Sequence, residues 1–411
     1  MKVLLLGVGM QGQAALHDLH ANPAVQWVVA ADRDGAALRA YVAAQGFGNR
    51  VSCTACDADK PDQVDRLFAH RPDVAIDLMP SQYQRIVAES AVRHGVHLVN
   101  TFYASPEVRE LDGPARSAGV AILPEFGLDP GIDLVLLGRA LACLDDIREI
   151  RSYGAGLPEP AAADNPLRYK VTWTFEGVLR TYRRVARYIR DGAVVEVGAD
   201  DVFNPAHVHR VTVDGLGELE AYPNGDATRY LDAVGPAAGL GLMARYTLRW
   251  PGHCAFWKTL VDLHLLDPEP VVVDGVAVDR LRYLARALEP HLRLGDGERD
   301  IAMVRIETVG RRDGRPARAV HQVIDRRDLA TGLTAMSRTV GFTASIGAQM
   351  IVDGRISGRG VLSPVRDVSY ESLVGELRRR RIEVTEAIGP GESAGGSGDH
   401  PPATSRSSNT R

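Results

Sequence analysis

The sequence predicts an α/β protein of two domains, in which a doubly wound parallel sheet is followed by a second, mixed α/β domain. Three observations support this prediction. Short apolar runs alternate with helix-length segments through the first third of the chain, a glycine-rich turn follows the first run directly, and the pattern changes near Asp133. At 411 residues the chain exceeds the usual size of one domain, and a hydrophobic content of 45% can fill two cores.

The elements of the first domain alternate regularly. Strands buried on both faces appear as short apolar runs, and we expect six of them, at Val3–Leu6, Val25–Ala31, Val51–Cys56, Val74–Leu78, His97–Val99 and Val120–Leu123. Helices are expected between them, at Gln11–His20, Gly35–Ala44, Asp62–Ala69, Gln82–His94 and Pro106–Ala118. Because strand–helix–strand units wind right-handedly, this alternation predicts a Rossmann-type sheet.

The glycine-rich turn predicts a dinucleotide-binding site. It consists of Gly7-Val8-Gly9-Met10-Gln11-Gly12, which closes the first strand and opens the first helix. Gly7 permits the tight turn, Gly9 lets a pyrophosphate approach the backbone, and Gly12 allows close packing of helix on strand. The free N–H groups and the dipole at the helix start, around Met10 and Gln11, favour this anion. The motif alone is weak evidence, but its position between strand and helix supports the prediction.

Asp32 predicts which dinucleotide binds. It ends the second strand, 20 residues after Gly12, where a carboxylate accepts hydrogen bonds from the ribose hydroxyls and repels a 2′-phosphate. The neighbouring Arg33 is a possible partner of that phosphate, so the preference is not absolute. We expect NAD rather than NADP.

Three loops after strands are expected at the nicotinamide end of the site, because ligands of such sheets bind beyond the carboxyl ends of the strands. They are Met79-Pro80-Ser81-Gln82, Asn100-Thr101-Phe102-Tyr103 and Pro124–Gly131. Pro80 and Ser81 are assigned to the cofactor. Ser81 and Asp129 have an alternative interpretation as turn or helix-capping residues.

The second domain begins after Asp133 with an apolar helix at Leu134–Leu144. Alternating segments follow at Tyr169–Phe175, Val194–Val197 and Ala244–Trp250, which are typical of a mixed or antiparallel sheet. Helical character returns at Thr343–Val352, and Arg359–Leu362 is then expected to fold back onto the first domain.

The expected domains are therefore a discontinuous nucleotide-binding domain of residues 1–130 and 340–386, and a substrate-binding and dimerisation domain of residues 131–339. Residues 387–411 are rich in Gly, Ser and Pro and poor in aliphatic side chains, which predicts a disordered tail.

Several motifs after the nucleotide domain resemble the saccharopine dehydrogenase family, and in particular its lysine 6-dehydrogenase-like branch. The first is the crossover Gly127-Leu128-Asp129-Pro130-Gly131-Ile132-Asp133. The second runs from Gly156-Leu157-Pro158 through Asn165-Pro166-Leu167-Arg168-Tyr169-Lys170 to Gly177-Val178-Leu179, and the third is Tyr246–His253. Ile346–Met350 and Gly360–Leu362 also match, so the resemblance covers residues 1–385.

The resemblance implies a fold and a class of chemistry. Members close their Rossmann domain with C-terminal residues and insert a mixed α/β domain that carries the substrate site and the dimer contact. They oxidise or form a C–N bond using a nicotinamide cofactor. The lysine 6-dehydrogenase branch uses NAD to deaminate lysine to a semialdehyde, which cyclises, whereas saccharopine reductases favour NADP. We therefore expect a homodimer that acts on an amino acid or a related amine.

This chemistry needs a group that removes the proton of an amine and a partner for a carboxylate. The candidate catalytic residues are Tyr169, Lys170, His253 and Asp129, and the candidate substrate-binding residues are Glu125, Arg249 and Tyr103. Structural alternatives remain for several of them: Tyr169 packs, Lys170 is solvated, or His253 belongs to the core or caps a helix. The aromatic segment from Trp250 to Trp257 leaves room for a larger substrate than lysine.

Composition argues against other classes of protein. With a net charge of −4, the chain lacks the excess of positive charge that is typical of nucleic-acid-binding proteins, and no apolar run has the length of a membrane span. Cys53 and Cys56 lack a second pair for zinc, so we expect no metal site. Without a recognisable signal peptide, the expected location is the cytoplasm. The run Arg378–Arg381 is interpreted as the solvated face of a helix.

Three functional hypotheses remain open at this point. The leading one is an NAD-dependent amino-acid dehydrogenase that releases ammonia. The second is a reductase that joins an aldehyde and an amino acid into a secondary amine with NADPH, like saccharopine or carboxyspermidine. The third is a sensor that binds NAD without turnover.

Overall fold

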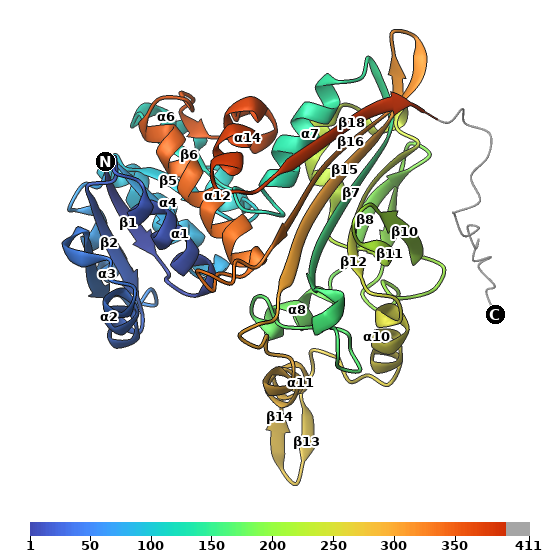
Figure 1. The fold of residues 1–411 in the computed structure, drawn as a ribbon, viewed down its shortest axis with the longest axis horizontal. Helices are drawn as coiled ribbons and strands as arrows, with labels where there is room; N and C mark the ends of the chain where they lie inside the picture. Colours follow the sequence, from blue (N-terminus) through green and yellow to red (C-terminus); the bar gives the residue numbers. More distant parts are fainter. Residues whose placement is uncertain (392–411) are drawn as a thin grey trace. The chain divides into compact units, whose positions relative to one another are not determined.

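The structure is a computed structural model, which describes residues 1–391 of the chain. These residues form two compact units. Over the described residues, unit 1 consists of Met1–Ala142, Arg299–Ile306 and His321–Glu386, and unit 2 consists of Cys143–Glu298, Glu307–Val320 and residues 387–391. Figure 1 shows the elements of both.

Unit 1 contains a sheet in which, over the described residues, seven strands run parallel in the order β17-β6-β5-β4-β1-β2-β3. The strands are β1 (Lys2–Leu6), β2 (Trp27–Asp32), β3 (Val51–Ala55), β4 (Val74–Asp77), β5 (His97–Asn100), β6 (Ala121–Leu123) and β17 (Gly360–Val361). Its helices are α1 (Met10–Ala21), α2 (Gly35–Ala44), α3 (Pro61–Phe68), α4 (Gln84–His94), α5 (Pro106–Arg109), α6 (Asp112–Ser117), α7 (Ile132–Ala142), α12 (Ala335–Val352), α13 (Pro364–Asp367) and α14 (Tyr370–Arg379). The predicted doubly wound α/β fold is confirmed.

The six predicted strands and the return of the C-terminal segment to the sheet are also confirmed, since β17 pairs in parallel with β6. The helix expected over Pro106–Ala118 is wrong in one respect, because it is broken into α5 and α6. Pro114 explains the break: the ring of a proline inside a helix clashes with the carbonyl four residues earlier, which here is that of Glu110.

Helix α12 packs along α1, as Figure 1 also shows, and it contacts β4 and β5. The two helices approach closely at Gly341, where an added Cβ atom would lie 2.3 Å from the carbonyl oxygen of Gln11. The start of α12 is fixed by Asp300, which accepts hydrogen bonds from the N–H groups of Ala335 and Met336. The C-terminal part of the chain therefore supports the helix that carries the glycine turn.

The second sheet is mixed, and it contains the strands of unit 2 together with β15, β16 and β18, parts of which belong to the segments of unit 1. Over the described residues it has nine strands, in the order β10-β11-β12-β7-β15-β16-β18, with β8 beside β12 and β9 beside β8. The strands are β7 (Asp146–Pro158), β8 (Ala186–Arg190), β9 (Ala193–Val197), β10 (His209–Val213), β11 (Gly217–Pro223), β12 (Leu242–Arg249), β15 (Asp300–Arg312), β16 (Arg315–Arg326) and β18 (Val384–Pro390). The helices are α8 (Phe175–Thr181), α9 (Leu231–Val234), α10 (His253–Asp262) and α11 (Arg280–Leu288), and β13 (Val271–Val273) pairs with β14 (Val276–Val278) in a separate hairpin. The predicted mixed second sheet is confirmed.

One expected strand of this sheet is absent from the described residues. Tyr169–Phe175 is irregular backbone up to the start of α8 at Phe175. The side chain of Asn165 explains this difference: its carbonyl accepts the N–H of Leu167, and its amide donates to the carbonyl of Tyr169. Because this side chain occupies backbone groups that a sheet ladder needs, the alternating pattern does not become a strand.

The disordered tail was predicted to begin too early. β18 extends to Pro390, so residues 387–390 are part of a strand that pairs with β16. Val384 and Ile388 are half-buried in this strand, and pairing satisfies backbone groups that composition alone assigned to solvent. The remaining tail, residues 392–411, lies outside the described residues.

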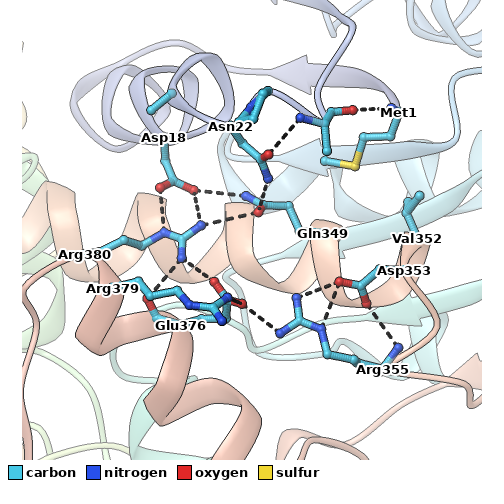
Figure 2. Close-up of a pocket in the computed structure, with 13 residues that line it drawn as sticks. Met1, Asp18, Asn22, Gln349, Val352, Asp353, Arg355, Glu376, Arg379 and Arg380 are labelled. Atoms are coloured by element: carbon cyan, nitrogen blue, oxygen red, sulfur yellow. Dashed lines mark hydrogen bonds and ion pairs between the residues drawn. The ribbon is translucent and has the colours of Figure 1, made fainter.

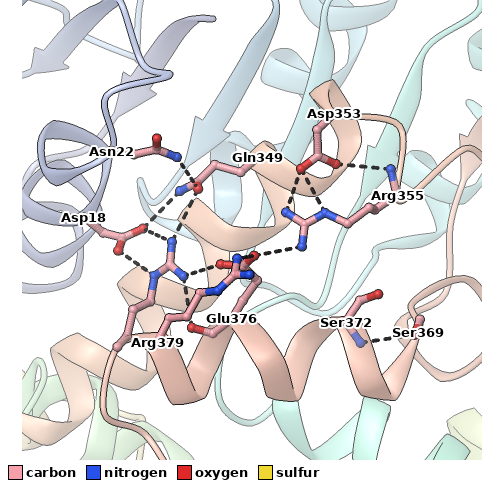
Figure 3. A network of polar contacts seen from close by, with 10 residues as sticks. Asp18, Asn22, Gln349, Asp353, Arg355, Ser369, Ser372, Glu376 and Arg379 are labelled. Carbon is pink, nitrogen blue, oxygen red and sulfur yellow. Dashed lines mark hydrogen bonds and ion pairs between the residues drawn. The ribbon is translucent and has the colours of Figure 1, made fainter.

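The interpretation of the arginine run as a solvated face is wrong for Arg380. Its guanidinium bonds both oxygens of Asp18, at 2.5 and 3.0 Å, and its Nη1 lies 2.7 Å from a carboxylate oxygen of Glu376. Figure 2 shows this buried network, and Figure 3 shows that Arg355 and Arg379 reach the same glutamate. The network joins α14 to α1, so Arg380 has a structural partner far away in sequence.

Within residues 1–391, none of the helices has both the length and the apolar character that crossing a membrane requires.

We predict that Arg380→Met lowers the free energy of unfolding of unit 1 by about 3 kcal/mol, because it leaves the buried carboxylate of Asp18 without its cation. Urea denaturation followed by circular dichroism measures this. Arg379→Met is the matched control, since this side chain binds the same glutamate but is 75% exposed, and it should cost less than about 1 kcal/mol. Equal losses in the two variants would contradict the assignment.

Candidate functional site

The glycine turn of unit 1 has the geometry that a dinucleotide needs. Gly7 has φ +83°, and an added Cβ would lie 2.8 Å from the backbone of Leu78. A Cβ on Gly12 would lie 2.1 Å from the carbonyl oxygen of Gly7. Gly9 differs, because nothing in the described structure lies within 4 Å of its added Cβ. Two glycines are thus required by packing, whereas Gly9 faces open space that a ligand can approach.

The start of α1 carries no competing anion. Gly9 is the residue before the helix and provides no side-chain cap, and the first turn contains no acidic residue. Met10 is exposed and Gln11 is half-buried there. The N–H groups and positive dipole end of α1 are therefore available to a phosphate.

Asp32 lies beside this turn. One carboxylate oxygen accepts the N–H of Val8 at 2.7 Å, and the other accepts the N–H of Asp34 at 3.1 Å. The carboxylate is half-buried, so it fixes the turn and still borders solvent. A carboxylate at this position can also bind ribose hydroxyls. The ribose-binding role of Asp32 remains a prediction.

Arg33 is held by acidic neighbours. Its guanidinium lies 2.8 Å from Asp59 and 3.4 Å from Asp57, and it is 3.4 Å from the hydroxyl of Tyr83. The two carboxylates raise the pKa of Arg33, with Asp59 contributing most. Arg33 therefore already has counter-ions that a 2′-phosphate would have to replace.

The loops after β4, β5 and β6 contain the other predicted residues of unit 1. Pro80 and Ser81 are exposed after β4. Glu125 is buried after β6, and it accepts the N–H of Ala104 while its own N–H donates to Phe102. The structure thus brings Glu125 next to the loop that carries the half-buried Tyr103.

Acidic side chains gather in this region. Asp129 is half-buried and follows Glu125 in the loop, as predicted. Sequence reasoning missed Asp133 and Asp77, which are fully buried. Burial raises the pKa of each to about 7, although Asp133 accepts the N–H of Gly131 and Asp77 accepts that of Met79. In the sequence, the only indication of these two residues was the position of an acidic side chain in an otherwise apolar segment.

In unit 2, Arg249 is a buried cation inside a cluster of aromatic rings. Its guanidinium lies 5.5 Å from the ring centre of Tyr169. Its Nη1 donates to the carbonyl of Leu248, but its Nε has no hydrogen-bond partner among the described residues. Burial alone would lower the pKa of Arg249. The neighbouring hydroxyls of Tyr222 and Tyr182 have the opposite and larger effect, so the pKa of Arg249 lies above its ordinary value. The side chain stays charged without a carboxylate partner in the described part of the chain.

His253 begins α10 next to this cluster. Its Nε2 lies 3.0 Å from the hydroxyl of Tyr182, and its ring centre is 6.2 Å from that of Tyr169. Burial, together with the charge of Arg249, lowers the pKa of His253 well below its ordinary value. The imidazole is therefore neutral at physiological pH, and its nitrogen without a proton can accept a hydrogen bond.

The structure therefore brings together Tyr169, Arg249 and His253, but Lys170 has other partners. The ammonium of Lys170 is buried and lies 3.1 Å from both Asp164 and Glu298. Burial lowers its pKa, and the two carboxylates outweigh this and raise it. This weighs against the solvated alternative and against a role as proton acceptor, since a base must give up its charge.

Sequence reasoning missed most of the aromatic cluster. Tyr182 stacks edge-on against Phe203, at 5.1 Å between ring centres, and tilts against Trp257 at 4.8 Å. Tyr222 joins them from β11. These residues come from distant segments, so only the aromatic stretch from Trp250 to Trp257 gave a signal in the sequence.

Two cavities in unit 1 lie away from the predicted cofactor residues. One of about 680 Å³ is lined by Asp18, Gln349 and Arg380, near the C-terminal end of α1 (Figure 2). Another of about 590 Å³ lies against Lys2, Trp27 and Ser52, at the N-terminal ends of the strands. The glycine turn is at the opposite end of both α1 and β1, so neither cavity is the predicted dinucleotide site.

Two family models match the chain. The saccharopine dehydrogenase NADP binding domain matches residues 3–123, and the saccharopine dehydrogenase C-terminal domain matches residues 127–382. Saccharopine dehydrogenase (NADP(+), L-glutamate-forming) of Saccharomyces cerevisiae is 28% identical over 92% of this chain and 96% of its own length. The enzyme of that name from Pyricularia oryzae is 28% identical over 77% of this chain and 84% of its own length. Mitochondrial alpha-aminoadipic semialdehyde synthase of Bos taurus is 25% identical over 93% of this chain but 47% of its own length.

Solved structures agree with these matches. The apo structure of histidine-tagged saccharopine dehydrogenase (L-Glu forming) from Saccharomyces cerevisiae has a TM-score of 0.82 at 25% identity, covering 94% of this chain and 99% of that one. Homospermidine synthase from Legionella pneumophila in complex with NAD shares the fold. Its TM-score is 0.64 at 11% identity, and the match covers 99% of this chain and 95% of that one. The predicted Rossmann NAD(P)-binding domain and the family resemblance are confirmed: the chain belongs to the saccharopine dehydrogenase family.

Proposed function

We propose that this protein is an NAD-dependent oxidoreductase that makes or breaks the C–N bond of an amino acid carrying a substituted amine, as in saccharopine. The single observation that carries the substrate class is Arg249, a buried cation without a carboxylate partner in the described structure. The names of the relatives support the secondary amine, which was the second of the functional hypotheses.

A buried charge without a counter-ion is costly, and proteins keep one where a ligand provides the opposite charge. The planar guanidinium of Arg249 suits a carboxylate, which it can bind through two parallel N–H groups. The hydroxyl of Tyr222 lies in the same cluster as a further donor, whereas the hydroxyl of Tyr182 contacts His253. An amino-acid carboxylate therefore fits this site better than a neutral amine.

The chemistry also needs a group that accepts a proton. The bound nicotinamide would accept a hydride from the carbon next to nitrogen, and the nitrogen lone pair can then form an iminium only if the amine has lost its proton. We assign His253, which Tyr182 orients, to take up this proton while the amine is bound in unit 2.

The choice of NAD rests on the acidic groups at the ends of β2 and β3. Asp32 borders the ribose position, and Asp57 and Asp59 neutralise Arg33. A 2′-phosphate would meet carboxylates where it needs a free cation. The yeast and Pyricularia relatives are named for NADP(+), so we propose that this chain differs from them in its cofactor.

A second candidate is oxidative deamination of lysine with release of ammonia. The observation that favours it is this same acidic group of Asp32, Asp57 and Asp59, because the resemblance associates NAD with the lysine 6-dehydrogenase branch. In both candidate reactions Arg249 binds the carboxylate of the substrate. The reactions differ in the product that receives the nitrogen, which is an amino acid in the first and ammonia in the second.

The proposal predicts that the purified chain reduces NAD with saccharopine, with formation of an amino acid and an aldehyde. An absorbance screen of NAD and NADP with saccharopine, lysine and other amines measures this, and an ammonia assay separates the two candidates. Release of ammonia from lysine would favour the second candidate. If no amine led to reduction of NAD or NADP, the proposal would be contradicted in favour of the hypothesis of a sensor that binds NAD without turnover.

With the active substrate, Arg249→Met should lower kcat/KM at least 100-fold, which corresponds to about 2.7 kcal/mol. NAD affinity and thermal stability should be unchanged, because methionine keeps the packing and removes a buried unpaired charge. Arg190→Met is the matched control, since Arg190 also lies over a tyrosine ring, that of Tyr188. Normal kinetics in Arg249→Met would exclude a role in substrate binding.

Asp32→Gly should weaken NAD binding at least tenfold and narrow the difference between NAD and NADP. Fluorescence titration of both reduced cofactors measures the two dissociation constants. Asp62→Asn, an exposed change on α3, should alter neither. An unchanged cofactor preference in Asp32→Gly would remove Asp32 from the site.

A further inference from the structure

The cavity of about 680 Å³ in unit 1 has a wall rich in charged side chains, and none of the predicted cofactor or substrate residues belongs to it. It lies between the C-terminal ends of α1 and α12 and helix α14 (Figure 2). We call it the arginine cavity, after Arg355, Arg379 and Arg380 in its wall. Sites for small molecules commonly have volumes of about 300 to 1,000 Å³, so this cavity has room for a ligand larger than a single ion.

The acidic side chains of this wall are already occupied. Asp18 and Glu376 are buried, and each of their carboxylate oxygens accepts a hydrogen bond from an arginine. The two oxygens of Asp353 accept from the backbone N–H and from the guanidinium of Arg355. The three carboxylates thus balance the three arginines in charge. An ammonium group of a ligand would have to displace an arginine from them.

The arginines, in contrast, keep unused donors. A guanidinium has five N–H groups. Within residues 1–391, Arg379 uses one of them, on Glu376, and its side chain is 75% exposed. Arg355 uses three, two on Asp353 and one on Glu376, and it is 35% exposed. The accessible polar groups of these two side chains are therefore donors, which favours a ligand group that only accepts hydrogen bonds.

The two guanidiniums also converge. The Nη1 atoms of Arg379 and Arg355 lie 2.6 and 2.8 Å from the same oxygen of Glu376, so they are at most about 5.4 Å apart (Figure 3). One anion can reach both, because a charge-assisted N–H···O bond spans about 2.7–2.9 Å. A phosphate monoester has three acceptor oxygens and close to two negative charges at neutral pH. It can therefore engage two arginine forks, whereas a carboxylate matches only one.

We propose that the arginine cavity is a second ligand site, in which Arg379 and Arg355 bind the phosphate of a small phosphate monoester. The rest of the cavity, with Ala21, Pro23 and Val352 in its wall, accommodates the organic part of this ligand. The site is separate from the dinucleotide site, because the glycine turn lies at the opposite end of α1. The proposal does not depend on the catalytic one.

Isothermal titration calorimetry of the full chain tests this, with glycerol 3-phosphate, ribose 5-phosphate and phosphoserine as ligands, each with and without saturating NAD. At least one of them should bind at one site per chain, with the same affinity in both conditions. Inorganic phosphate, which lacks the organic part, and succinate, which carries carboxylates instead, should bind at least tenfold more weakly.

Arg379→Met should weaken binding of the monoester at least tenfold and leave NAD affinity and thermal stability unchanged. Arg378→Met is the matched control, because Arg378 is 64% exposed at the end of the same helix and pairs with Glu383 outside the cavity wall. This control should bind like the wild type.

Four results would overturn the proposal. They are the absence of saturable heat with all three monoesters, loss of their binding when NAD is present, equal weakening in Arg378→Met and Arg379→Met, and affinity for inorganic phosphate or succinate equal to that for the monoester. The second result would assign the phosphate to the dinucleotide site. The third would reduce the effect to general surface charge, and the fourth would make a simple anion the ligand.

Discussion

The hydrogen bond from Val8 to the carboxylate of Asp32 is the interaction on which the nucleotide site depends. It fixes the glycine turn between β1 and α1, and Gly7 and Gly12 permit this turn only because they have no side chain. The result is a helix start with unsatisfied N–H groups and no acidic residue in its first turn. The rest of unit 1 supports this helix: α12 packs against α1 at Gly341, and Arg380 binds Asp18 near its other end.

Arg380, Lys170 and Arg249 are three cations with little exposure that differ in their counter-ions. Arg380 lies between Asp18 and Glu376, and Lys170 lies between Asp164 and Glu298. Both are neutralised by carboxylates of the chain itself. Arg249 is surrounded by tyrosines instead, and its Nε has no partner within the described residues. Because proteins rarely leave a buried charge unpaired, this difference supports the proposed role of Arg249 in binding an anion.

Most of the fold could be predicted because the signals are local. Apolar runs, helix periods and the glycine turn follow from neighbouring residues, and even the break before Pro114 could have been recognised in the sequence. What could not be predicted depends on contacts between distant residues. Nothing in Arg378–Arg381 indicates that Arg380 meets Asp18, and nothing near His253 in the sequence indicates that Tyr182 and Phe203 pack against it. For the candidate site, the cofactor residues were recognisable from their motif, whereas the protein partners of Lys170 and Arg249 required the structure.

The central claim is that the start of α1 holds a pyrophosphate while Asp32 holds a ribose. Isothermal titration calorimetry of the purified chain with NAD and with NADP tests it most directly. The account predicts saturable heat at one site per chain with NAD, and affinity at least tenfold lower with NADP. An absence of binding heat with both dinucleotides, at several temperatures, would contradict it.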